Sequence, residues 1–162
     1  MSSVVDTNVI AVANGRAEQA SVECVDASIE YLSLLRDSGV VVLDDGLLMV
    51  DEYKRHATAE GQPGIGDMFL RHLLDNLGNT ERCNVVHITP HDDREFEEFP
   101  DDEALRKFHR DDRKFVAAAL RCEPTAEVVN AVDSDWWDFQ EALSRHGVAV
   151  RFLCPEIMAR DG

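Results

Sequence analysis

The chain opens with a β-branched run, Ser3-Val4-Val5-Asp6-Thr7-Asn8-Val9-Ile10, that decides its fold class. Such a run is typical of a buried strand, which we expect to end at Asp6 or shortly after it. Asp6 stands among apolar side chains, where an acid without a partner is costly to bury. It therefore either belongs to a charged site at the end of the strand or caps a turn with Thr7 and Asn8.

Strands and helices alternate along the rest of the predicted chain. The apolar run Val40-Val41-Val42-Leu43 is typical of a short strand covered on both faces. Apolar periodicity predicts helices over about 17–36, 46–59, 66–78, 111–121 and 136–145, and strands over 84–88, 127–132 and 148–153. This alternation predicts an α/β fold, a three-layer sandwich with a mainly parallel sheet of four to five strands covered by helices. In such sheets the site lies at the carboxyl ends of the strands.

The length of 162 residues suits a single domain over residues 1–162. Residues 91–103 are dense in Asp and Glu, and we expect an acidic, solvated loop or insertion there. No stretch approaches the roughly 20 apolar residues of a membrane helix, and the N-terminus lacks an export signal. We therefore expect a cytoplasmic protein that does not contact a membrane.

The four cysteines, Cys24, Cys83, Cys122 and Cys154, are far apart in the sequence. They form no Cys-x-x-Cys pair and have no histidine at zinc-ligand spacing. Buried free thiols are the prediction.

The net charge of −16, from 32 acids against 16 bases, is unusual for a nucleic-acid-binding protein, because most such proteins are basic. Two alternatives remain open. Either the substrate is not a polyanion, or metal ions and a local basic patch supply the attraction that the whole molecule lacks.

Glu52 is the acid of the 46–59 helix that we expect to face the interior. It shares a helix face with Leu48 and Met49, whereas Asp51 is spaced to form a surface ion pair with Arg55. Glu52 is therefore a candidate site residue.

Asp112 begins the strongest helical pattern in the chain. Phe115, Val116 and Ala119 follow it on one continuous helix face, so Asp112 heads a buried stripe. The alternative is an acid that only stabilises the helix N-terminus through the macrodipole.

Three acids follow the 127–132 strand in the segment Asp133-Ser134-Asp135-Trp136-Trp137-Asp138-Phe139. Asp135 is placed to act both as the N-cap of the next helix and as a metal ligand. Asp138 lies in the first helical turn, where it either reaches the same pocket or only favours the helix dipole.

Four carboxylates, Asp6, Glu52, Asp112 and Asp135, are thus predicted to meet at one edge of the sheet. Carboxylates so close together need a cation to stay ionised. Hard oxygen ligands with few histidines favour Mg²⁺ or Mn²⁺ over zinc.

These motifs resemble the PIN-domain family, and within it the VapC-type ribonuclease toxins. Asp6-Thr7-Asn8-Val9-Ile10 is similar to the opening motif, Glu52 matches the second acid, and residues 112–119 resemble the Asp-headed, alanine-rich helix. Asp135 and Asp138-Phe139 resemble the closing element. Asp133 at the position of the closing threonine and the acidic 91–103 segment depart from the toxin pattern.

The resemblance implies a PIN-like sandwich and an endoribonuclease that cuts single-stranded RNA with Mg²⁺ or Mn²⁺. It implies catalytic roles for Asp6, Glu52, Asp112 and Asp135, with Asp138 as a further metal ligand. Thr7 or Asn8 would hold a water or a substrate phosphate. Arg110, Arg113 and Lys114 would meet backbone phosphates, although a solvated face that neutralises the acidic loop explains them equally well.

The resemblance also implies two protein partners, a basic antitoxin and a second copy of the chain in a homodimer. Two other functions remain open. One is a non-catalytic, PIN-shaped interaction module; the other is a receiver-like, Mg²⁺-binding signalling domain, which would need a lysine after the last strand that this sequence lacks.

Overall fold

The computed structural model, which describes residues 2–161, contains a parallel sheet of five strands in the order β3-β2-β1-β6-β7. The strands are β1 (Ser2–Val5), β2 (Val40–Asp44), β3 (Cys83–Val86), β6 (Glu127–Asn130) and β7 (Val150–Phe152). The predicted α/β class and parallel sheet are confirmed. The central strand β1 is held in register by pairs such as Val4 with Val128, both fully buried.

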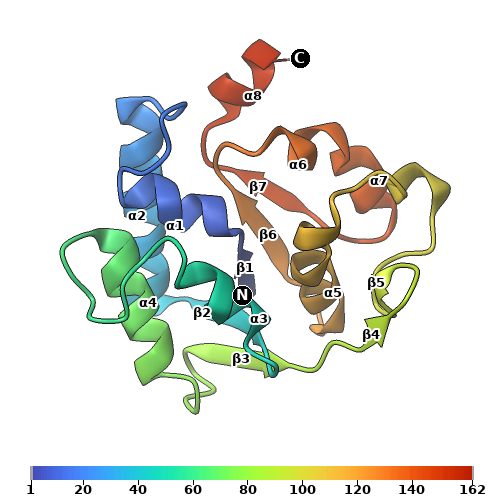
Figure 1. Cartoon of the computed structure of the whole chain (residues 1–162), viewed down its shortest axis with the longest axis horizontal. Coiled ribbons are helices and arrows are strands. Elements are labelled where there is room, and N and C mark those ends of the chain that lie inside the picture. Colours follow the sequence, from blue (N-terminus) through green and yellow to red (C-terminus); the bar gives the residue numbers. More distant parts are fainter. Residues whose placement is uncertain (1, 162) are drawn as a thin grey trace.

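Helices cover both faces of the sheet and make three layers (Figure 1). On one side lie α1 (Thr7–Ala13), α2 (Val22–Ser38) and α4 (Ile65–Asp75), and on the other α5 (Arg113–Arg121), α6 (Ser134–Asp138) and α7 (Gln140–Arg145). The short α3 (Leu48–Tyr53) follows β2, and α8 (Pro155–Asp161) follows β7. None of the helices within residues 2–161 has both the length and the apolar character needed to cross a bilayer.

The strand order bears on the receiver-like alternative. Numbered along the chain, the five strands run 3-2-1-4-5, whereas the flavodoxin-like order of receiver domains is 2-1-3-4-5. The first strand therefore has the wrong neighbours for that alternative.

The first strand ends at Val5, close to Asp6 as predicted, but the helix α1 that follows was not predicted. Asp6 caps this helix by accepting a hydrogen bond from the backbone N–H of Asn8 at 2.9 Å. Val9 and Ile10, the β-branched residues after the strand, are buried on α1. A capping acid has here overridden the β-propensity of the residues that follow it.

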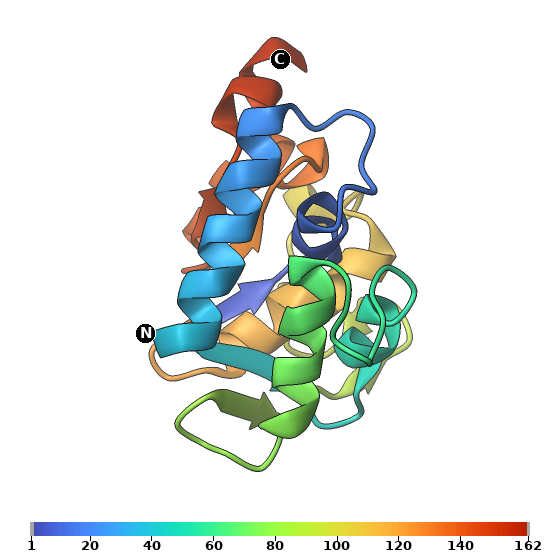
Figure 2. The ribbon, with the colours of Figure 1, turned by 90° about the vertical axis from the view of Figure 1, so that its left-hand side faces the viewer.

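The prediction of four free thiols is wrong for two of them. Cys24 and Cys154 form a disulfide across 130 residues of sequence, with their Cα atoms 5.3 Å apart. The bond ties the first turn of α2 to the start of α8, which lies above that end of α2 (Figure 2). Cys83 and Cys122 are free and buried, as predicted. Long-range packing, which no sequence spacing reveals, makes the difference.

The acids of the acidic segment lie at the surface or are half buried, but two of its apolar residues anchor it. A hairpin of β4 (Pro90–His91) and β5 (Glu95–Phe96) forms its first part, and the 3₁₀ turns η1 (Glu103–Leu105) and η2 (Arg110–Asp112) follow. Phe96 and Phe99 are buried in the core. The apolar residues between the acids therefore fix the segment on the side of the sheet covered by α5.

Candidate metal centre

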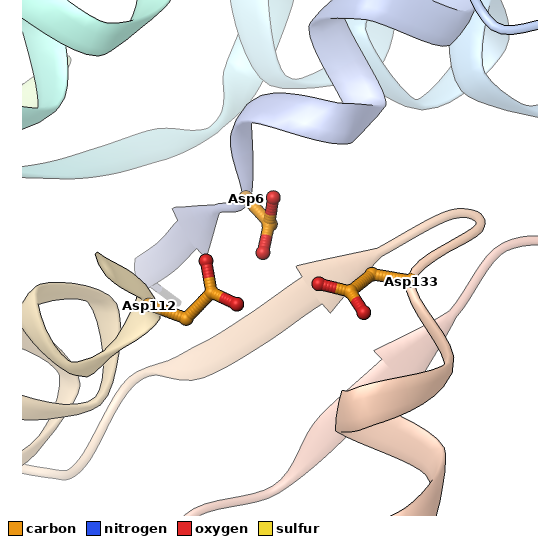
Figure 3. A group of neighbouring side chains, drawn as sticks. All are labelled: Asp6, Asp112 and Asp133. Carbon is orange, nitrogen blue, oxygen red and sulfur yellow. The ribbon is translucent and has the colours of Figure 1, made fainter. Parts of the chain in front are cut away.

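Three aspartates from distant parts of the chain meet at the carboxyl edge of the sheet. Asp6 joins β1 to α1, Asp112 precedes α5, and Asp133 follows β6. One oxygen from each lies within 4.8 Å of the others, and the three carboxylates face a common point (Figure 3). The parallel sheet explains this convergence, because neighbouring strands β1 and β6 end at the same edge.

Asp6 is the most buried of the three, with 4% of its surface exposed. Its Oδ1 accepts the backbone N–H of Asn8 at 2.9 Å, and its Oδ2 accepts the indole Nε1–H of Trp136 at 2.6 Å. Burial raises the pKa of Asp6 to about 6, against the opposing effect of these two hydrogen bonds. The carboxylate is thus held in one orientation at a cost in desolvation.

The environment of Asp112 disfavours an ionised carboxylate more than that of Asp6 does. Burial, followed by the charges of Asp6, Asp133 and Glu52, raises the pKa of Asp112 to about 8. Its carboxylate does not cap α5. Asp133, by contrast, caps α6 by accepting the N–H of Asp135 at 3.0 Å, which leaves its second oxygen available.

The donor set fits a hard divalent cation. Three carboxylates approach one another, and a bound cation would relieve both the repulsion between them and the raised pKa values. All three ligand atoms are oxygens, without a histidine or cysteine among them, so Mg²⁺ or Mn²⁺ suits the centre better than zinc. Asp6, Asp112 and Asp133 are therefore the residues that could hold a metal ion.

Glu52 lies beside this group but is already paired. Its Oε1 accepts a hydrogen bond from Lys114 Nζ at 2.7 Å, and its Oε2 accepts the hydroxyl of Thr7. Both members of the ion pair are largely shielded from solvent. The structure thus places Glu52 near the centre, as the sequence analysis expected, but gives its charge a partner.

Asp135 and Asp138 are not part of the group that meets. The sequence analysis took Asp135 as the N-cap, but α6 begins at Ser134, so the cap and the inward-facing carboxylate belong to Asp133. Asp135 contributes its backbone N–H to that cap, and Asp138 is exposed. The N-cap of α6 thus lies two residues before the position that the sequence analysis gave it.

Thr7 and Asn8 have internal partners in place of the predicted substrate contacts. Asn8 Oδ1 accepts the N–H groups of Ala131 and Val132, at 2.9 and 3.0 Å, and its Nδ2 donates to Asn130 at 2.8 Å. Asn8 therefore joins α1 to the end of β6 and fixes the turn that carries Asp133.

The three predicted phosphate-binding cations also have internal partners. Arg113 is 5% exposed and donates to the carbonyl oxygens of Leu105, Arg106 and Phe108. Arg110 pairs with Glu95 at 2.8 Å, and Lys114 pairs with Glu52. Arg113 and Lys114 are buried and hold the structure together, while Arg110 remains half exposed.

Trp136 is the site residue that the sequence analysis missed. The sequence analysis gave it no role, because its separation of 130 residues from Asp6 gives no sign of a hydrogen bond between them. Only the folded chain brings the indole N–H to the carboxylate.

No protein-family model matches the chain, and the comparisons with curated proteins and with solved structures give no match either. Function is therefore inferred from the carboxylate cluster, the fold and the sequence resemblance.

Proposed function

We propose that the chain is a Mg²⁺- or Mn²⁺-dependent nuclease, specifically an endoribonuclease that hydrolyses single-stranded RNA. The observation that carries the proposal is the convergence of Asp6, Asp112 and Asp133 at the carboxyl edge of a parallel sheet. The resemblance to PIN-domain ribonucleases supports the same reaction, although Asp133 takes the place that the sequence analysis gave to Asp135.

In this proposal the carboxylates of Asp6, Asp112 and Asp133 hold the divalent ion. When bound, the ion supplies an activated water and neutralises charge on the phosphate and on the leaving oxygen. The attack of water on phosphorus breaks the bond to the 3′-oxygen and leaves a 5′-phosphate and a 3′-hydroxyl, as the resemblance implies. The Lys114–Glu52 pair keeps a fourth acid next to the centre with its charge balanced.

Two exposed cations remain to attract the RNA backbone. Arg106 and Lys107 line a groove of about 920 Å³ together with His109 and Asp111, and Asp111 directly precedes Asp112. The same groove is also lined by Asp93, Asp101 and Asp102, so Arg106 and Lys107 themselves, and not a net positive surface, would attract the RNA backbone. The net charge of −16 and the carboxylate cluster would suit inhibition by a basic antitoxin.

A non-catalytic interaction module is the second candidate. One observation favours it: Arg113 and Lys114, which should contact phosphates in the nuclease, are committed to internal partners. In that case the carboxylates would bind a metal without cutting RNA.

The test is cleavage of an end-labelled single-stranded RNA with Mn²⁺ or Mg²⁺. We expect fragments with 5′-phosphates from the wild type and a loss of at least about 100-fold in rate for Asp112→Asn, because the residue holds the ion. Asp26→Asn is the matched control: its side chain is exposed on α2 and lies outside both the cluster and the groove. Intact RNA with a folded, metal-loaded wild type would reject the nuclease and leave the interaction module.

A further inference from the structure

Trp136 is fully buried and makes a specific polar contact with the metal centre. Its Nε1–H donates to Asp6 Oδ2 at 2.6 Å. The donor lies in α6, three residues after Asp133, and the acceptor lies at the end of β1. The indole therefore connects the two strand ends that carry ligands.

The contact fixes the direction in which the Asp6 carboxylate points. Oδ1 is held by the backbone N–H of Asn8 and Oδ2 by the indole, so the group cannot rotate without breaking one of the two bonds. Each carboxylate oxygen can accept about two hydrogen bonds or metal contacts. One position on each oxygen thus stays free, and one of the two oxygens lies within 4.8 Å of an oxygen of Asp112 and of Asp133.

A stack of phenylalanine rings holds the indole in place. Phe108 packs edge-on against Trp136, with ring centres 5.0 Å apart. Phe108 also contacts Phe99 and Phe139 at 5.8 and 5.5 Å. The guanidinium of Arg113 lies 4.6 Å from the Phe99 ring centre.

Trp137, the neighbouring tryptophan, has a different environment. Its ring contacts Phe152 at 5.1 Å, and it is partly exposed. Within residues 2–161 its indole nitrogen donates no hydrogen bond to a carboxylate. The two adjacent residues therefore form a natural comparison.

We propose that Trp136 is a positioning residue for the metal centre: its indole N–H keeps the Asp6 carboxylate facing Asp112 and Asp133, and the stack of Phe99, Phe108 and Phe139 keeps the indole in place. This inference rests on the proposed metal centre. It gives a role to Phe99, which belongs to the acidic 91–103 segment that departs from the toxin pattern. Groups that orient a metal ligand typically change metal affinity by about 10- to 100-fold when they are removed.

The test compares Mn²⁺ binding, measured by titration calorimetry, in Trp136→Phe and Trp137→Phe. We expect the dissociation constant to rise about 10-fold or more in Trp136→Phe and less than about 2-fold in Trp137→Phe. If Trp136→Phe does not fold, benzothienylalanine at position 136 keeps the bicyclic shape and removes only the N–H. Equal affinities in the folded variants would overturn the inference.

A second measurement separates this inference from the proposed function. Absence of Mn²⁺ binding in the wild type would reject the metal centre itself. The indole ¹⁵N–¹H resonances still test the hydrogen bond: Asp6→Asn removes the charge of the acceptor and should move the Trp136 resonance upfield by more than that of Trp137. A Trp136 resonance that does not shift in Asp6→Asn would overturn the inference, whether or not the protein binds Mn²⁺.

Discussion

Lys114 Nζ lies 2.7 Å from Glu52 Oε1 and also donates to the backbone carbonyl of Asp111, next to the metal-centre residue Asp112. One cation is thus fixed at the rim of a group of acids. It balances the charge of Glu52, and its own charge lowers the pKa of Asp112 against the raising effects of burial and of the neighbouring acids.

Lys114→Met should therefore have opposite effects on stability and on metal binding. It leaves the shielded Glu52 without its partner, and we expect the free energy of unfolding without metal to fall by up to about 3 kcal/mol. Mn²⁺ should bind more tightly, because a fourth uncompensated carboxylate adjoins the centre. Urea unfolding with EDTA and Mn²⁺ titration measure the two effects.

Lys107→Met is the control for Lys114, because Lys107 is exposed and forms no ion pair among the described side chains. Its unfolding free energy and Mn²⁺ affinity should stay close to those of the wild type. Weaker Mn²⁺ binding in Lys114→Met would mean that the lysine organises the centre and does not merely oppose its charge.

Asp133→Asn and Asp135→Asn should show which of the two aspartates is the third metal ligand. The structure places Asp133 in the cluster, whereas the sequence analysis predicted Asp135. Asn can still cap α6, so Asp133→Asn removes one charged ligand with little loss of stability. We expect Mn²⁺ affinity to fall at least about 10-fold in Asp133→Asn and less than about 3-fold in Asp135→Asn. A larger loss of Mn²⁺ affinity in Asp135→Asn than in Asp133→Asn would mean that Asp135 is the third ligand.

The sequence predicts the sheet well because its strands are short apolar runs bounded by turn residues. The runs at 40–43 and 127–132 correspond to β2 (Val40–Asp44) and β6 (Glu127–Asn130). It does not predict α1, because the β-branched residues Val9 and Ile10 hide the helix that the cap formed by Asp6 begins. It also fails for the disulfide, because Cys24 and Cys154 meet only through tertiary packing.

The candidate site is predicted in outline because parallel strands bring their carboxyl ends together. Asp6 and Asp112 do meet. The third acid was misplaced because the start of a helix can move by one or two residues, and each step rotates a side chain by about 100°. Trp136 was missed because nothing in the sequence indicates that its indole donates a hydrogen bond to the carboxylate of Asp6, 130 residues away.

The metal-free protein should lose stability as the pH rises. The folded pKa values of Asp6 and Asp112, about 6 and about 8, lie above the ordinary value of 3.8. The folded state therefore binds more protons than the unfolded state between about pH 4 and pH 8, and the unfolding free energy falls across this range, with the larger part of the fall due to Asp112. Saturating Mn²⁺ should abolish the fall, since it stabilises the ionised carboxylates.

Urea unfolding at pH 5 and pH 8, with EDTA or with Mn²⁺, measures this dependence. Asp112→Asn is the control, because a neutral amide at that position should remove most of the fall. Metal-free stability that rises between pH 5 and pH 8 would contradict the raised pKa values.

Loss of the Cys24–Cys154 disulfide should destabilise the protein without changing the metal centre. The bond closes a loop of 130 residues, and we expect its removal to cost about 2–4 kcal/mol. Urea unfolding of the wild type with a reductant and of Cys24→Ser/Cys154→Ser should give similar losses. The reductant should have no effect on the stability of the double variant. The Mn²⁺ dissociation constant should be the same for the oxidised wild type, the reduced wild type and the double variant.

Arg113→Met should weaken the fold and spare RNA binding, whereas Arg106→Ala/Lys107→Ala should do the opposite. The Arg113 guanidinium is buried and serves three backbone carbonyl oxygens, so its loss leaves them without donors and should cost about 2–4 kcal/mol. Arg106 and Lys107 are exposed along the groove, and their removal should weaken single-stranded RNA binding roughly 10-fold and reduce its salt dependence. Fluorescence anisotropy at several salt concentrations, below the unfolding temperature of each variant, measures the RNA affinity. A folded Arg113→Met that loses RNA binding, together with a double variant that keeps it, would contradict this prediction. It would mean that Arg113, on α5, contacts the RNA phosphates.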